Sequence, residues 1–230
     1  MYKRQALEQP LKPVTAIVGG SKISTKLELL DNLSNKVEYL IIGGAMANTF
    51  LSAQGYGIGI SLTEKKMIQT AKEIIQELKY KKCKLVLPLD IVCAYSLNEK
   101  KEAQTFRVDC CPIDKMILDI GIMSQKNIMD IINKSKTLIW NGPLGAFETR
   151  PFDQGTNNIA KYAANRTSEK QLISIAGGGD TVSALKTSAS ITKFSYVSTA
   201  GGAFLEWLEG KSLPGCLLYT SDAADDQACG

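Results

Sequence analysis

The sequence predicts an α/β fold, a doubly wound parallel sheet of about six strands with helices on both faces in a Rossmann-like three-layer sandwich. Apolar runs of strand length alternate along the chain with segments that are compatible with helices. Five of the apolar runs end in glycine-rich turns. Such alternation requires right-handed crossovers between parallel strands, which cover both faces of the sheet. Because ligands of these sheets bind at the carboxyl ends of the strands, we expect a binding edge where the glycine turns gather.

The expected elements follow this alternation along the chain. The expected strands are residues 15–18, 38–42, 84–90, 115–119, 137–140, 171–175 and 194–198. The expected helices cover residues 26–33, 46–51, 64–79, 124–133, 157–165, 182–185 and 203–209. The polar stretch 98–112 is expected to form a hairpin or an excursion.

Two helix starts carry capping signals. The stretch Ala176-Gly177-Gly178-Gly179-Asp180-Thr181 follows an apolar run, and Asp180 is expected to cap the helix after it. Three glycines leave the main chain bare, and the unpaired amides of a helix start favour an anion. Thr25 and Glu28 have the spacing of a capping box, which would place Lys26 in the first turn of its helix.

Composition excludes several classes of protein. The chain has 230 residues, 44% apolar residues and a net charge of +4, with its lysines scattered or paired with Glu. This pattern argues against a nucleic-acid protein. A run of about 18 apolar residues and a secretory leader are both missing, so we expect a cytoplasmic protein without a membrane partner. The lengths and patterns fit one large domain or two small ones.

Residue usage also limits the chemistry. The six cysteines have no CxxC spacing and the chain has no histidine, so reduced cysteines are expected rather than a zinc site. Without an imidazole base, catalysis must rely on Lys, Asp, Glu and main-chain dipoles. Neither GxGxxG nor GxxxxGK[ST] occurs.

Two lysines and two carboxylates near the turns are candidate site residues. Lys22 and Lys26 would share a helix face, either as a solvated surface or as partners of an anion whose charge offsets their conflict with the helix dipole. Asp180 could be a plain helix cap, a ligand of phosphate-bound Mg²⁺, or both. Glu148 could be a surface carboxylate or could accept a hydrogen bond from a ribose hydroxyl. Fixed amides, lysines and one metal carboxylate suit phosphoryl transfer, where catalysis is mainly positioning and charge stabilisation.

Five segments closely resemble the phosphoglycerate kinase family, in its C-terminal, nucleotide-binding half. They are residues 16–26, 40–50, 140–148, 174–181 and 198–215, which together span roughly residues 6–215. The resemblance implies reversible phosphoryl transfer between ATP and the carboxylate of 3-phosphoglycerate, with Mg²⁺. A carboxylate acceptor is already ionised at neutral pH, which explains why no base is needed.

The resemblance also implies roles for single residues. Lys26 would contact the nucleotide phosphates and the transferring group as a catalytic residue, and Lys22, also catalytic, would line the same phosphate path with Gly20 and Ser21. The phosphate and metal cradle would be Gly178, Gly179, Asp180 and Thr181, with Asp180 toward Mg²⁺. Gly43, Gly44 and Ala45 would form the adenine wall with Asn141 and Pro143 nearby, and Glu148 would bind the ribose.

The sequence departs from the family pattern in several places. We expect the N-terminal domain that would bind 3-phosphoglycerate to be absent from this chain. Ile122-Met123 replaces a Pro-containing continuation, and Ile117 stands where the family has a small residue beside the base. We expect residues 6–215 to form the nucleotide-binding domain and residues 1–5 and 216–230 to be non-native. The complete form is expected to be a monomeric glycolytic kinase. Two alternatives remain open, a nucleotide-binding module without turnover and a structural α/β domain whose glycines are only turns.

Overall fold

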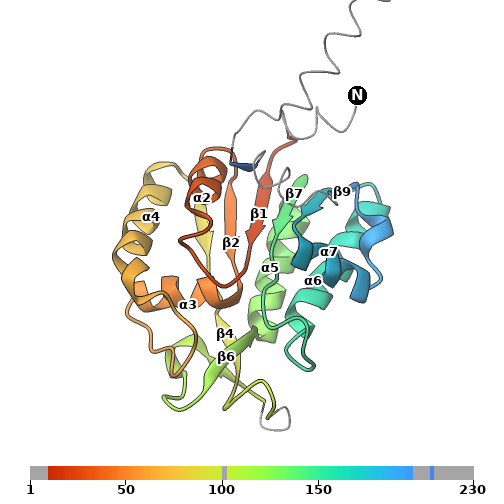
Figure 1. The fold of residues 1–230 in the computed structure, drawn as a ribbon. Coiled ribbons are helices and arrows are strands. Elements are labelled where there is room, and N and C mark those ends of the chain that lie inside the picture. Colours follow the sequence, from red (N-terminus) through yellow and green to blue (C-terminus); the bar gives the residue numbers. More distant parts are fainter. Residues whose placement is uncertain (1–9, 100–102, 199–207, 210–230) are drawn as a thin grey trace, which may run out of the picture.

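A computed structural model of the protein describes residues 10–99, 103–198 and 208–209 (Figure 1). Its main feature is a six-stranded parallel sheet with the order β3-β2-β1-β7-β8-β9. These strands are β1 (Val14–Val18), β2 (Tyr39–Ile42), β3 (Lys84–Val86), β7 (Thr137–Asn141), β8 (Ile173–Gly177) and β9 (Tyr196–Ser198). The predicted α/β fold with a sheet of six parallel strands is therefore confirmed.

Helices cover both faces of this sheet. They are α2 (Leu27–Ser34), α3 (Gly44–Ala53), α4 (Ile68–Tyr80), α5 (Ile122–Lys134), α6 (Gln154–Ser168) and α7 (Gly179–Thr187), with short 3₁₀ helices at Lys65–Met67, Val108–Cys110 and Ile191–Lys193. Successive residues of β1 point to opposite faces, so Ala16 and Val18 join one buried cluster and Ile17 the other. The first cluster packs against α2, α3 and α4, and the second against α5, α6 and α7.

A second sheet was not predicted from the sequence. It is antiparallel, with the order β5-β4-β6, and consists of β4 (Asp90–Ala94), β5 (Gln104–Arg107) and β6 (Met116–Ile120). The expected single strand over residues 84–90 is wrong, because β3 ends at Val86 and a new strand begins at Asp90 in the other sheet. Pro88 lies between them, and proline has no N–H to donate to a ladder.

Asp90 fastens the second sheet to the main body. Its carboxylate accepts hydrogen bonds from the amides of Met123 (2.9 Å) and Ser124 (2.7 Å) in the first turn of α5. Gly121, just before α5, has no room for a side chain, because a methyl group there would lie 2.2 Å from an Asp90 carboxylate oxygen. The end of β6 and the start of α5 therefore both pack directly against Asp90 of β4.

Both predicted helix caps are wrong. Lys26, not Thr25, is the N-cap residue of α2, and the Thr25 hydroxyl donates to the carbonyl of Lys22 at 3.0 Å. Gly178 is the N-cap of α7 with a φ of 95°, and Asp180 lies inside the first turn. A glycine reaches this left-handed conformation without strain, whereas Asp at the cap would need a different turn. The predicted turn at Gly201-Gly202 and most of the helix predicted over residues 203–209 lie outside the described residues.

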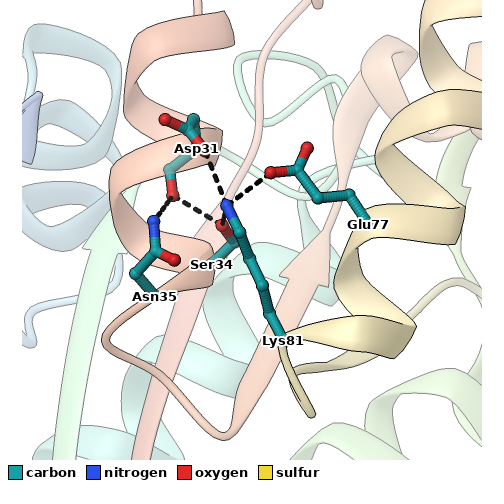
Figure 2. Close-up of polar contacts among 5 residues, drawn as sticks. All are labelled: Asp31, Ser34, Asn35, Glu77 and Lys81. Carbon is teal, nitrogen blue, oxygen red and sulfur yellow. Dashed lines mark hydrogen bonds and ion pairs between the residues drawn. The ribbon is translucent and has the colours of Figure 1, made fainter.

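An ion-pair cluster joins α2 to α4 (Figure 2). The ammonium of Lys81 lies 2.7 Å from Asp31 and 2.5 Å from Glu77, and it donates to the Ser34 hydroxyl at 2.9 Å. Burial acts to lower the pKa of Lys81, but its hydrogen bonds to Asp31 and Glu77 outweigh burial and raise the pKa. Because Asp31 and Glu77 are mostly exposed, the cluster orients the two helices more than it stabilises them.

None of the helices in the described part of the chain is long and apolar enough to span a membrane.

Candidate functional site

Four of the glycine turns lie at one edge of the main sheet. β1, β2, β7 and β8 run parallel, so the turns that follow Val18, Ile42, Asn141 and Gly177 all leave the same edge (Figure 1). The prediction that these turns gather at one edge is confirmed for these four strands. The turn after β9 lies outside the described residues.

Glycines let three of these turns pack against each other. Gly44 has a φ of +65°, and a methyl group there would lie 2.6 Å from the carbonyl oxygen of Gly20. Gly142 has a φ of +97°, and a methyl group on it would lie 2.2 Å from the carbonyl oxygen of Gly19. A methyl group on Gly43 would lie 2.5 Å from the Leu144 side chain. These glycines are explained by contact between turns, which needs no ligand.

The turn before α7 differs, because space remains beside it. Gly178 has a φ of +95°, and a methyl group on it would lie 2.7 Å from the Asn141 amide nitrogen. A methyl group on Gly179 would meet no atom within 4 Å. Gly179 and Asp180 are exposed, so the first-turn amides of α7 adjoin open space where an anion is favoured.

Lys26 lies behind these turns with its ammonium half-buried. Its Nζ donates to the carbonyl of Gly19 at 2.8 Å and to Oδ1 of Asn141 at 2.5 Å. The other side of the Asn141 amide donates to the carbonyl of Gly177 at 2.9 Å, which links the ends of β7 and β8. Burial lowers the pKa of Lys26 to about 8, and the nearby charge of Asp180 offsets only part of this effect.

Lys22 and Thr181 lie differently from what the sequence suggested. Lys22 is exposed in the loop before α2, so it does not share a helix face with Lys26, and that expectation is wrong. Thr181 is buried, and its hydroxyl accepts a hydrogen bond from the amide of Gly142 at 2.7 Å. This bond joins the start of α7 to the turn after β7.

A cavity of about 440 Å³ opens beside the turns. The predicted site residues that line it are Gly20, Ser21, Gly44, Ala45, Pro143, Glu148 and Asp180. The predicted residues that do not line it are Lys22, Lys26, Gly43, Asn141, Gly178, Gly179 and Thr181. The turns after β1, β2 and β7 thus form one wall of the cavity. Lys26 and most of the residues at the start of α7 do not line it.

The opposite wall was largely missed from the sequence. It comes from β6 and its neighbourhood, with the lining residues Met116, Ile117, Leu118, Asp119 and Ile120 joined by Leu62, Pro88 and Leu97. Among these residues, the resemblance to the family implies a place beside the base only for Ile117. The apolar run 115–119 predicted a strand, but nothing in it indicates that the strand leaves the main sheet to face the turns.

Asp119 is the buried carboxylate of this wall. It accepts hydrogen bonds from the amides of Gly155 (2.7 Å) and Ile120 (2.9 Å). Burial raises the pKa of Asp119 to about 7, these amides act to lower it, and the charge of Asp153 adds to the rise. Gly155 is the second residue of α6, so Asp119 joins the cavity wall to the start of that helix.

The described residues contain no group of three His, Cys, Asp or Glu side chains that could hold a metal ion. Asp180 is the carboxylate where the cavity meets the start of α7. One carboxylate suits Mg²⁺, which commonly keeps several waters and binds through one or two carboxylates together with substrate phosphates.

The fold and the site define a class of protein. A doubly wound parallel sheet, a cavity at the carboxyl ends of its strands and a helix start open to an anion are features of α/β domains that bind phosphorylated ligands. A sequence profile described as phosphoglycerate kinase matches residues 1–211. The chain therefore belongs to the phosphoglycerate kinase family, and the resemblance found in its motifs is confirmed.

Relatives and solved structures agree with this assignment. The phosphoglycerate kinase of Methylorubrum extorquens (strain PA1) is 56% identical over 211 residues, which are 92% of this chain and 53% of the relative. That of Bradyrhizobium diazoefficiens is 54% identical over 211 residues, with the same shares of 92% and 53%. The structure of phosphoglycerate kinase from Coxiella burnetii superposes with a TM-score of 0.86 at 44% identity, covering 90% of this chain and 53% of that one. The chain thus spans about half the length of the relatives it matches.

Proposed function

We propose that this chain is the nucleotide-binding part of a kinase that transfers a phosphoryl group reversibly between ATP and 3-phosphoglycerate, with ADP and 1,3-bisphosphoglycerate as the reverse pair. The observation that carries the proposal is the shared edge at which the cavity meets the open start of α7, with Lys26 close behind. Family membership supports this reaction, and the cytoplasmic location and monomeric state of the complete form are proposed with it. Residues 6–215 are proposed as the domain, with residues 1–5 and 216–230 outside it.

The cavity is the proposed site of the nucleoside. Gly44, Ala45 and Pro143 would form one wall of the adenine site, with Ile117 facing them from β6. Glu148 is exposed at the cavity rim, where its carboxylate could accept hydrogen bonds from ribose hydroxyls. Gly43 would support this wall from behind, because it packs directly against Leu144.

The phosphates would leave the cavity toward α7 and the loop after β1. Gly20 and Ser21 line the cavity at that side, and Gly178 and Gly179 present the helix start. Thr181 and Asn141 would hold the turns in place through their bonds to Gly142 and Gly177. Bound Mg²⁺ would neutralise phosphate charge, and Asp180 is the residue proposed to hold it.

Lys26 and Lys22 are the proposed catalytic residues. Within the described part of the chain, the two acceptors of the Lys26 ammonium are neutral, so neither compensates its charge. A phosphoryl group carries negative charge in the transition state, and a fixed ammonium beside it lowers the barrier. The attacking carboxylate of 3-phosphoglycerate needs no deprotonation, which agrees with the absence of histidine.

Calorimetry with Mg-ADP tests the proposal directly. Heat of binding at millimolar ligand is expected, and its absence would leave only the structural α/β alternative. Asp180→Asn should weaken binding of Mg-ADP about tenfold, a loss of about 1.4 kcal/mol, and should change metal-free ADP binding much less. Equal losses with and without Mg²⁺ would show that Asp180 acts only on the helix start.

A nucleotide-binding module without turnover is the second candidate function. It is favoured by one observation, that the chain matches 53% of its M. extorquens relative. A cleft that must close around two substrates cannot do so with one wall.

A further inference from the structure

The loop between β1 and α2 carries both candidate lysines, and one carboxylate from elsewhere in the chain holds it. Glu64 accepts two hydrogen bonds from Ser24, one from the Ser24 amide at 3.1 Å and one from its hydroxyl at 2.5 Å. The two bonds use different oxygens of the carboxylate. Ser24 lies between Lys22 and Lys26, so a restraint on Ser24 restrains both lysine positions.

Hydrogen bonds to α3 hold the segment that carries Glu64. Its amide donates to the hydroxyl of Thr49 at 3.1 Å, and that hydroxyl lies 3.2 Å from the hydroxyl of Thr63. Two positions before Glu64, the carbonyl of Leu62 accepts a hydrogen bond from Asn48 at 3.0 Å. Asn48 and Thr49 are buried in α3, with 1% and 0% of their surfaces exposed. The carboxylate therefore reaches the loop from a segment that α3 fixes in place.

The surroundings of Glu64 stabilise the negative charge of its carboxylate. Burial acts to raise its pKa, but the hydrogen bonds from Ser24 and Ile23 and the charge of Lys22 outweigh burial and lower the pKa. An acidic group beside a phosphate site would repel the ligand, which makes direct contact with phosphate unfavourable. Glu64 is also absent from the residues that line the cavity. Its bonds point instead to the loop.

We propose that Glu64 is a positioning residue for the phosphate-binding loop. Its carboxylate fixes Ser24, and through Ser24 it sets where Ser21, Lys22 and Lys26 stand relative to the nucleotide phosphates. This inference rests on the proposed nucleotide-binding function and names a residue that acts on it without touching the nucleotide.

The test compares ligands that differ only in phosphates. Glu64→Gln keeps the length of the side chain, but its contacts with Ser24 become neutral hydrogen bonds, which are about half as strong as bonds to a carboxylate. Calorimetry should show ADP and ATP binding weakened by about 3- to 10-fold, because bonds to a charged acceptor become neutral ones, and adenosine binding changed less than about twofold. The matched control is Glu73→Gln on the exposed face of α4, which should change none of the three affinities.

A cycle with Ser24→Ala separates positioning from general damage. Because Ser24→Ala removes the hydroxyl bond that Glu64→Gln weakens, the two losses should not add, and the double variant should bind ADP better than the sum of the single losses predicts. Hydrogen exchange supplies a readout without nucleotide, and amides of residues 20–26 should exchange faster in Glu64→Gln and not in Glu73→Gln.

The outcomes are separable. Wild-type chain that binds no ADP would overturn the proposed function, and the phosphate role of Glu64 with it. Wild-type binding with equal loss of adenosine and ADP in Glu64→Gln would mean a general structural role and would overturn this inference alone. Unchanged ADP affinity with unchanged loop exchange would overturn it as well.

Discussion

The Lys26 ammonium has an unusual environment for a charged group. It is half-buried and donates to the Gly19 carbonyl and the Asn141 amide oxygen, and burial lowers its pKa to about 8. A buried cation with neutral partners is costly to the free protein. Polyphosphate bound close by would remove that cost, because an opposite charge stabilises the protonated form.

This environment predicts a pH dependence of nucleotide binding. In the free chain Lys26 loses its proton as pH rises through about 8, whereas bound phosphate would keep the proton on. Binding should therefore take up a proton above that pH, and ADP affinity should fall toward pH 9.5. Calorimetry in buffers of different ionisation enthalpy measures both quantities.

Two variants control this experiment. Lys26→Met should bind ADP about tenfold more weakly at pH 7, a loss of about 1.4 kcal/mol, and should lose most of the pH dependence. Lys26→Arg keeps its charge over the whole range and should flatten the profile without that loss at pH 7. If Lys26→Met kept the wild-type slope, another group would be responsible.

Two glycines separate a folding role from a binding role. In Gly44→Ala the new methyl group would lie 2.6 Å from the carbonyl oxygen of Gly20, at a φ of +65°. We expect a loss of at least about 1–2 kcal/mol in unfolding free energy, the cost of the left-handed conformation for an L-residue. Urea unfolding monitored by circular dichroism measures it.

Gly179→Ala is the matched partner of that change. The new methyl group meets no atom within 4 Å, and alanine at the first position of α7 is a better helix former by about 0.5–1 kcal/mol. Stability should be unchanged or slightly higher, while Mg-ADP binding weakens about tenfold because the methyl group occupies the approach to the helix start. Unaltered ADP affinity would place the phosphates elsewhere.

Among the secondary-structure elements, those of the main sheet could be predicted because their signals are local. The apolar run before Gly19, the one before Gly43 and the one before Gly142 each became a buried parallel strand with its turn at the expected edge. The same reasoning found the helices that follow them. Local patterns suffice here, because these three strands are buried on both faces and read as apolar runs.

The caps and the second sheet could not be predicted because tertiary contacts decide them. Asp180 is a good N-cap by residue type, but Gly178, two positions before it, takes that place with a positive φ next to Asn141. β6 carries an ordinary apolar run, yet it pairs with β4 in the second sheet and not with a strand of the main sheet. Its role as a cavity wall depends on Asp119 meeting Gly155, 36 positions away.

The link between β6 and α6 predicts how stability changes with pH. The carboxyl of Asp119 has a pKa of about 7 in the folded chain, against an ordinary value of 3.8, because burial disfavours its charge. Between these values the folded state binds more protons than the unfolded state. The contribution of Asp119 to stability is therefore fully present below pH 3.8 and is lost as pH rises through about 7.

Asp119→Asn should remove this contribution. Relative to the variant, the wild-type chain should lose stability as pH rises from about 4 to about 7 and should change little above about 8. Guanidinium unfolding midpoints across this range measure the difference. Asp114→Asn, at an exposed position, is the control and should track the wild type. Parallel curves for Asp119→Asn and the wild type would contradict the assignment of a raised pKa to Asp119.

At the level of the whole molecule, the cavity and the loop that carries the candidate lysines lie at the same edge of the main sheet. The glycine turns, the start of α7 and the loop held by Glu64 all border this edge. Phosphoryl transfer needs a second substrate in line with the terminal phosphate and water excluded from both. The face that would meet that substrate lies beside Asp180 and Lys22, both of which are exposed.

Turnover therefore depends on what stands opposite this face. The chain alone should bind Mg-ADP and show no measurable transfer from 1,3-bisphosphoglycerate in a coupled assay, because nothing positions the acyl phosphate. Fusing it to the part of the M. extorquens relative that it does not match should restore transfer.

In that fusion Lys26→Ala should lower kcat by about 100-fold or more while the KM for nucleotide changes much less, as expected for charge stabilisation specific to the transition state. The Glu73→Gln fusion controls for assembly. A Lys26→Ala fusion with full kcat would refute a catalytic role for this lysine, and turnover by the chain alone would show that one face of the cleft is enough.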